Sequence, residues 1–145
     1  MTANSATDAW QAVMSTMSTD REVFESRLRQ LLADDFVRVD LRQLVAMPRA
    51  TRDEFIAVSL MTHFDLDVVP HTETDDVLAV SGDRLGLIRA RLVYDGSGQI
   101  EYLAVVRFDD AVEQLERMVM FDPDDLEAAR AELDRLAVML LEPEG

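Results

Sequence analysis

The segment Ile100–Phe108 constrains the fold most, because both of its alternating faces are apolar. The two faces carry Ile100, Tyr102, Ala104, Val106 and Phe108 on one side, and Leu103 and Val105 on the other. A period of two predicts a β-strand. A strand that is apolar on both sides belongs in a sheet that is buried on both sides. The helices can therefore cover one face of that sheet, and a partner subunit or the long C-terminal helix must cover the other.

Further strands are predicted around this segment from the same period-two alternation. They fall at residues 36–42, 65–72, 76–81, 84–94 and 115–121. Pro70 lacks a backbone donor, which predicts that the strand containing it is an edge strand or carries a bulge. Gly82-Asp83 and Asp95–Gly98 are typical of hairpin turns. The later strands are therefore predicted to be antiparallel neighbours.

Helical periodicity predicts four helices, at residues 7–17, 20–33, 51–62 and 122–141. Thr19 with Glu22 matches the capping box that begins a helix, and Thr51 with Glu54 matches it again. Asp122 is a natural N-cap for the last helix. Early helices followed by antiparallel strands predict an α+β fold. We expect a single domain over residues 1–145, with an N-terminal helix within 1–18 and a C-terminal helix within 122–142.

The charge of the chain argues against two classes of partner. Its 29 acidic and 14 basic side chains give a net charge of -15. Phosphate backbones and anionic lipid surfaces carry the same sign, so nucleic-acid and membrane binding are disfavoured. The N-terminus lacks the pattern of a signal peptide, and no apolar run approaches the ~20 residues that cross a bilayer. The predicted location is cytoplasmic.

Residue types that hold metals or cofactors are scarce. The chain has no Cys and two His. His63 and His71 are eight residues apart, which is not a metal-ligand spacing. All the basic residues are Arg, so no lysine amine is available for Schiff-base chemistry. We expect no metal and no cofactor.

Several segments resemble the nuclear transport factor 2-like superfamily, the SnoaL-like group with the cystatin-like cone. Leu32–Asp40 looks like the turn into its first strand, and Val105–Asp109 resembles its penultimate strand. Leu78–Leu85, Met120–Leu126 and Ala131–Asp134 are similar to actinobacterial modules of this fold that stand alone or end signalling chains. The resemblance implies a curved, mostly antiparallel sheet wrapped around the N-terminal helices. It also implies an apolar pocket, lined by Trp10, Met14, Phe36, Tyr102, Ala104 and Val106.

Asp40 is the candidate catalytic residue that the resemblance offers. It matches the general base of ketosteroid isomerase, a member of the superfamily. That enzyme also needs a protonated Asp and a Tyr to hold the dienolate oxygen. Ala104 stands at the Asp position, and the first helix offers Val13, Met14 and Met17 instead of Tyr. Ketosteroid isomerase activity is therefore not expected.

Two other arrangements of Asp40 are open at the level of sequence. A salt bridge to Arg38 or Arg42, each two residues away on the same strand face, would hold its pKa low. Alternatively, Arg38 and Asp40, or Arg89 and Arg91, could form a cluster like the Asp-Arg-Asp set of limonene-epoxide-hydrolase relatives. That cluster would need a second carboxylate from Asp65, Asp67 or Asp76.

The leading functional prediction is a non-catalytic module that binds a small apolar ligand or acts in regulation. The two-sided apolar strands predict a homodimer through the sheet. The alternative is a cofactor-free isomerase, cyclase or epoxide hydrolase with Asp40 as base and Arg38 beside it. An unpaired Asp40 would favour the enzyme, and a salt-bridged Asp40 would favour the module.

Overall fold

The chain folds as α+β, as its sequence predicts. The structure, a computed structural model, describes residues 4–14, 20–43, 47–65, 72–94 and 98–141. Its helices are α1 (Ser5–Met14), α2 (Arg21–Leu31), α3 (Arg52–Leu60), a π-helical turn η1 (Met61–Asp65) and α4 (Leu126–Leu141). Its strands are β1 (Leu32–Asp40), β2 (Ala50–Thr51), β3 (Thr72–Ser81), β4 (Leu85–Tyr94), β5 (Gly98–Phe108) and β6 (Leu115–Phe121). None of the described helices is both long and apolar enough to span a membrane.

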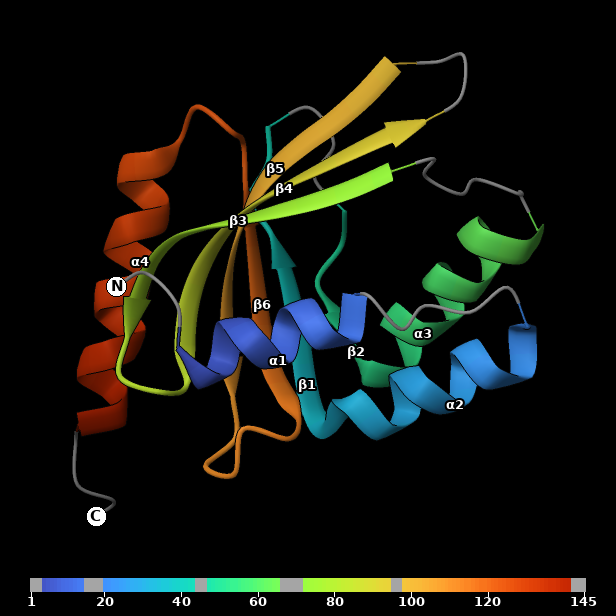
Figure 1. Cartoon of the computed structure of the whole chain (residues 1–145), viewed down its shortest axis with the longest axis horizontal. Coiled ribbons are helices and arrows are strands. Elements are labelled where there is room, and N and C mark those ends of the chain that lie inside the picture. The colour runs from blue at the N-terminus through green and yellow to red at the C-terminus, as the bar shows by residue number, and fades with distance from the viewer. Residues whose placement is uncertain (1–3, 15–19, 44–46, 66–71, 95–97, 142–145) are drawn as a thin grey trace.

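The strands form one mixed sheet in the order β2-β1-β6-β5-β4-β3 (Figure 1). The pairs β3–β4, β4–β5 and β5–β6 are antiparallel, whereas β1 and β6 are parallel. The β3–β4 hairpin turns at Gly82, which has a φ of 59°. A positive φ is easy for glycine, because it has no Cβ.

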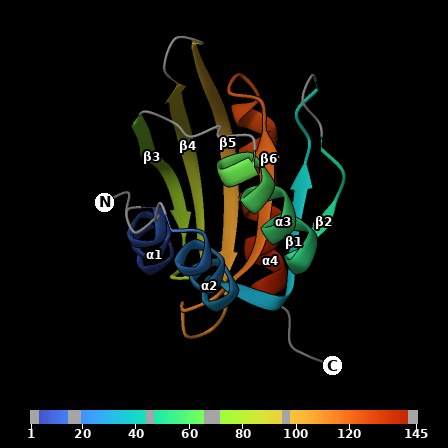
Figure 2. The same cartoon turned by 90° about the vertical axis from the view of Figure 1, so that its right-hand side faces the viewer.

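The two faces of the sheet are covered by different helices (Figure 2). We call the face under α1, α2 and α3 the inner face, and the face under α4 the outer face. The inner cluster includes Phe36, Ile88, Tyr102, Ala104, Val106 and Phe108. The outer cluster joins Leu87, Leu103, Val105 and Val119 to Ala129, Leu133 and Leu136 of α4. The second cover that the sequence requires is therefore supplied by α4 of the same chain.

Most helix starts agree with the sequence, and two differ in detail. The Glu54 carboxylate accepts from the backbone N–H and the hydroxyl of Thr51, as the capping box predicts. Helix α2 is capped by Asp20, not Thr19, because the Asp20 carboxylate accepts from the N–H groups of Glu22 and Val23. Asp20 was thus the better cap in the sequence, since a carboxylate also complements the helix dipole.

The predicted N-cap role of Asp122 is wrong. Helix α4 begins at Leu126, four residues later. The Asp122 carboxylate instead accepts a hydrogen bond of 3.0 Å from the backbone N–H of Gln43. This bond ties the chain after β1 to the end of β6. A tertiary donor has therefore replaced the helix amides that a local pattern predicts.

The predicted strand at 65–72 can be checked only at its two ends. Asp65 belongs to the π-helical turn that extends α3, which the prediction missed, whereas Thr72 begins β3. Residues 66–71, which include Pro70 and His71, lie outside the described residues. The strand predicted at 76–81 is the second half of β3, which lies at the edge of the sheet.

Candidate functional site

Asp40 lies at the end of β1 with its carboxylate fully enclosed. Its side chain is 0% exposed, and that of its salt-bridge partner Arg42 is 11% exposed. Oδ1 accepts from Arg42 Nε at 2.9 Å and from the Arg42 backbone N–H at 3.1 Å. Oδ2 accepts from Arg42 Nη2 at 2.7 Å and from the Met47 backbone N–H at 3.2 Å. The four donors occupy the roughly four lone-pair positions of a carboxylate.

These contacts decide the protonation state of Asp40. Burial alone would raise the pKa of its carboxyl, because a charge is poorly solvated inside a protein. The hydrogen bonds from the Arg42 side chain and from the Arg42 and Met47 amides outweigh burial and lower the pKa below its ordinary value. Asp40 is therefore held ionised, with its acceptor positions filled. It is poorly suited to remove a proton from a substrate.

Arg38 does not pair with Asp40, although both face inward from β1. Arg38 is 5% exposed, and its Nη2 donates to the Pro48 carbonyl at 3.1 Å. Its guanidinium lies 5.5 Å from the Phe55 ring centroid. Burial lowers the pKa of Arg38, which the Asp40 charge partly offsets. Arg38 thus serves to join β1 to α3 and to the segment before β2.

Arg89 and Arg91 cannot join a cluster with Asp40. Arg89 pairs with Leu103 in the β4–β5 register, so both arginines point to the outer face. There they flank Glu101, at 3.3 Å from Arg89 and 3.7 Å from Arg91. The Asp-Arg-Asp arrangement is therefore not formed by these residues.

The predicted pocket residues come together, but as packed core. Trp10, Phe36, Tyr102, Ala104 and Val106 all belong to the inner cluster, and each is at most 7% exposed. The side chain of Met14 lies outside the described part of the structure. The inner face stays apolar beyond this core, because Leu92 and Ile100 continue the Tyr102 side of β4 and β5. Ile100 is 45% exposed there.

Asp75 of β3 is a candidate that the sequence reasoning missed. It pairs with Ala90 of β4, and Ala90 pairs with Tyr102 of β5. Directly opposed residues share a face, so Asp75 faces inward beside an apolar floor. The predicted strand at 76–81 began one residue too late to include it. Extending the alternation back from Val77 would have placed Asp75 on the inner face.

The carboxyl of Asp75 lies beside the indole of Trp10. Burial raises the pKa of Asp75, the neighbouring Trp10 N–H lowers it, and the Asp76 charge adds to the rise. The net pKa lies above the ordinary value. The Trp10 indole N–H acts on Asp75 as a hydrogen-bond donor, which favours the ionised carboxylate. Trp10 Nε1 and Asp75 Oδ1 are both buried.

Comparison with known proteins identifies the fold. No family model and no curated protein matches the sequence. A SnoaL-like family protein from Agrobacterium tumefaciens has a similar structure at 13% identity and a TM-score of 0.54, over 80% of this chain and 92% of that one. An M. tuberculosis LEH-like epoxide hydrolase matches 95% of this chain and 97% of its own, at 13% identity and a TM-score of 0.53.

A de novo designed protein with the nuclear transport factor 2 fold also has a structure similar to that of this chain. It matches 88% of this chain and 92% of its own, at 14% identity and a TM-score of 0.51. This chain has the nuclear transport factor 2-like fold. At such low identities the likeness concerns the fold alone, and one fold hosts many functions. The function of this chain therefore depends on its own residues.

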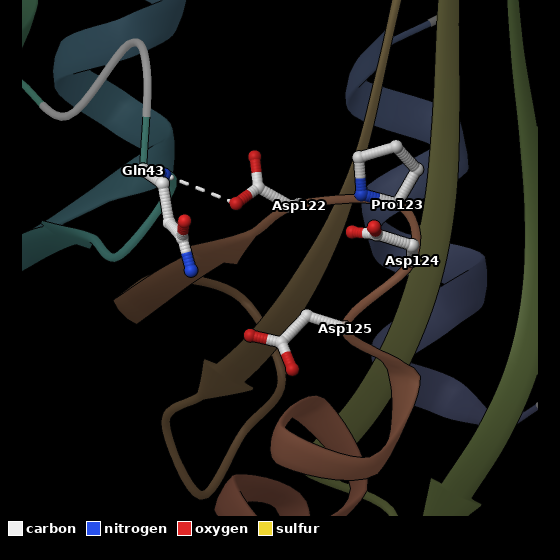
Figure 3. Close-up of a pocket in the computed structure, with 5 residues that line it drawn as sticks. All are labelled: Gln43, Asp122, Pro123, Asp124 and Asp125. Atoms are coloured by element: carbon white, nitrogen blue, oxygen red, sulfur yellow. Dashed lines mark hydrogen bonds between the residues drawn. The ribbon is translucent and has the colours of Figure 1, made fainter.

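One depression on this nuclear transport factor 2-like fold lies where β1 and β6 end. It has a volume of about 610 Å³ and is lined by Gln43, Asp122, Pro123, Asp124 and Asp125 (Figure 3). Over the part of the chain that the structure describes, no group of three or more His, Asp or Glu could hold a metal ion. His63 stacks on Phe24 at 4.7 Å between ring centroids. Neither feature adds a site.

We expect Asp75→Asn to stabilise this nuclear transport factor 2-like fold at pH 7, by up to about 1 kcal/mol. The amide carries no charge that burial penalises. The folded pKa of Asp75 lies above its unfolded value of about 3.9, so the wild-type penalty is absent below that value and develops as pH rises through the folded pKa. The gain in thermal midpoint should therefore be present at pH 7 and absent at pH 3. Asp76→Asn, an exposed neighbour on the other face, is the control. Equal melting of the two variants at pH 7 would contradict the prediction.

Proposed function

We propose that this chain is a non-catalytic module that binds a small apolar ligand on the inner face of its sheet. The observation that carries the proposal is the state of Asp40. Its carboxylate accepts four hydrogen bonds, and its pKa is lowered. A general base needs a free acceptor position and a pKa near the working pH. Asp40 offers neither, so it serves to fasten the chain after β1.

The binding surface that we propose is the inner shelf, formed by Ala90, Leu92, Ile100 and Tyr102. The register places these residues side by side on β4 and β5, facing the same way as the inner cluster. The end of β4 and the start of β5 extend beyond α1 and α2 (Figure 2). The exposed Ile100 continues the buried apolar surface there. An apolar ligand on the shelf would remove this side chain from water, which favours binding.

The enzymatic alternative has less support. An epoxide hydrolase is among the proteins that share the fold. Its activity cannot be carried to this chain at 13% identity. Two of the three carboxylates considered for the second position beside Asp40 are engaged elsewhere, since Asp65 pairs with Arg21 and Asp76 faces outward. Asp67 lies outside the described residues.

Binding can be tested with the single tryptophan as a reporter. N-phenyl-1-naphthylamine is an uncharged apolar probe that accepts energy from tryptophan. We expect saturable quenching of Trp10 emission at one probe per chain, because Trp10 is in the inner cluster. Ile100→Asp should weaken probe binding about tenfold by placing a charge on the shelf.

Gln99→Asp is the matched control, because it adds the same charge at the adjacent exposed residue, which points to the other face of β5. It should leave the affinity within about twofold. Absence of saturable binding, or equal weakening by the two substitutions, would refute the proposed function. Circular dichroism confirms that each variant is folded.

The predicted homodimer is part of the same proposal. The covering of the outer face by α4 already accounts for one observation that motivated it. The remaining support for the dimer is a set of apolar side chains on α4 that are exposed to solvent: Val138, Met139 and Leu141.

A further inference from the structure

Two arginines stand directly opposite each other on the outer face of the sheet, beside the turn that joins β5 to β6 (Figure 1). Arg107 of β5 pairs with Arg117 of β6, and on its other side Arg107 pairs with the buried Leu85 of the outer cluster. Directly opposed residues share a face, so both arginines lie on the outer face. Like charges in this arrangement destabilise a sheet. Their position therefore has a cost that the fold alone does not explain.

The charges around Arg117 are mainly positive. Burial lowers the pKa of Arg117 most, and the Glu132 carboxylate partly offsets this effect. The guanidinium groups of Arg135, Arg107 and Arg49 then lower the pKa further. Among the described residues that act on the charge of Arg117, three are therefore cations and one is an anion. Arg117 is a half-buried cation with a surplus of like charge around it.

The carboxylates nearest to Arg117 are engaged by other arginines. Glu132 accepts from Arg135 Nε at 2.6 Å within α4. Glu116 lies 3.3 Å from Arg107 Nε. Arg117 makes no ion pair and no side-chain hydrogen bond with the described residues, and its Nε is buried. The strongest local demand for a negative charge is therefore at Arg117.

The surrounding charges do not balance. We call the residues that pair with one another here, or that act on the charge of Arg117, the arginine patch. Its members are Arg49, Arg84, Arg107, Arg117, Arg135, Asp110, Glu116 and Glu132. Five positive charges thus face three negative charges, which leaves a surplus of two positive charges. This surplus lies on a chain whose net charge is -15.

A phosphate monoester has the chemistry that matches this surplus. Such a group carries a charge of about -1.5 to -2 at pH 7. Its oxygens suit the planar donor fork of arginine. Arg49 and Arg135 are exposed and Arg107 is half-buried, so a ligand can reach the patch from solvent. An extended polyanion suits it less, because carboxylates border the arginines and the chain as a whole is acidic.

We propose that the arginine patch binds the phosphate group of a small phosphomonoester, with Arg117 at its centre. The bound dianion would offset the repulsion between Arg107 and Arg117. The patch is on the outer face, whereas the inner shelf is on the opposite side of the sheet. It is therefore a second binding site, and it does not depend on the proposed function.

The test compares phenyl phosphate with phenyl sulfate by isothermal titration calorimetry at pH 7. The two compounds have nearly the same shape, but the phosphate is largely a dianion and the sulfate is a monoanion. We expect about one phenyl phosphate per chain, bound about tenfold more tightly than phenyl sulfate. The preference should shrink below about pH 6, where the phosphate gains a proton. Absence of saturable binding, or equal affinities for the two compounds at pH 7, would overturn the inference.

Three variants locate the site. Arg117→Gln should weaken phenyl phosphate binding about tenfold, and Arg49→Gln about threefold. Arg27→Gln is the matched control, because Arg27 is an exposed arginine of α2 on the other side of the sheet, and it should change the affinity by less than about twofold. Equal weakening by all three variants would overturn the inference. Arg49 is exposed, so Arg49→Gln keeps the test decisive if Arg117→Gln does not fold.

Two further measurements separate the outcomes. Arg117→Gln and Arg49→Gln should bind the naphthylamine probe as wild type does, because the probe occupies the inner shelf. Loss of probe binding in wild type with phenyl phosphate binding intact would refute the proposed function alone. A phosphoserine peptide should bind no more tightly than phenyl phosphate. Binding of the peptide about tenfold or more tighter would overturn the inference in favour of a phosphorylated protein partner.

Discussion

Leu136→Asp should largely unfold the protein, with a loss of about 4–5 kcal/mol in the free energy of unfolding. Leu136 is 1% exposed in the outer cluster between α4 and the sheet. A carboxylate at this position loses the apolar contacts and adds a buried charge without a partner. Domains of this size are stable by only about 5–15 kcal/mol, so the loss is a large part of the total.

The control for Leu136→Asp is Ala131→Asp on the same helix. Ala131 is exposed, so this change should alter stability by no more than about 1 kcal/mol, which is the range of helix propensities. Denaturant unfolding followed by circular dichroism measures both variants. Light scattering on wild type and on Val138→Asp tests the predicted homodimer separately. Similar stabilities for the two variants would show that α4 is not the cover of the outer face.

Asp40→Asn should lower the free energy of unfolding at pH 7 by about 2–3 kcal/mol. The amide cannot match the two-pronged contact with Arg42, and its N–H groups would face donors. In this variant Arg42 would keep one favourable contact for its charge, because its guanidinium lies 5.7 Å from the Tyr102 ring centroid. Thermal melts at pH 7 measure the loss. A variant that melted higher than wild type would contradict the assignment and restore Asp40 as a strained, base-like carboxyl.

The pH dependence of the Asp40 contribution has a defined sign. Its folded pKa lies below the unfolded value of about 3.9. The stability that it contributes is therefore present above that unfolded value and is lost as pH falls through the folded pKa. The difference between wild type and Asp40→Asn should shrink below about pH 4. Asp34→Asn is the control, because the Asp34 side chain is 99% exposed, and it should change little at either pH.

Much of the fold was predictable because local patterns and tertiary packing agree. The predicted strand at 115–121 is β6 without change of bounds, and the helix at 51–62 contains α3 with its Thr51 cap. The failures fall where a tertiary contact outcompetes a local one. Asp122 matches a helix N-cap by sequence, yet its carboxylate accepts a hydrogen bond from the backbone N–H of Gln43, which follows the neighbouring strand β1. The period-two alternation at 65–72 likewise predicted a strand from residue 65, where the structure has the π-helical turn Met61–Asp65.

The sequence by itself determined that the sheet needs a cover on each face, because Ile100–Phe108 is apolar on both sides. Only the tertiary structure decided that α4 of the same chain supplies the outer cover. It also decided which arginine binds Asp40. Arg38 and Arg42 are equally spaced from it, but β1 ends at Asp40, so the chain can turn and bring the Arg42 amide and side chain back to the carboxylate. Arg38 stays within the strand, where side chains two residues apart project side by side and need not meet.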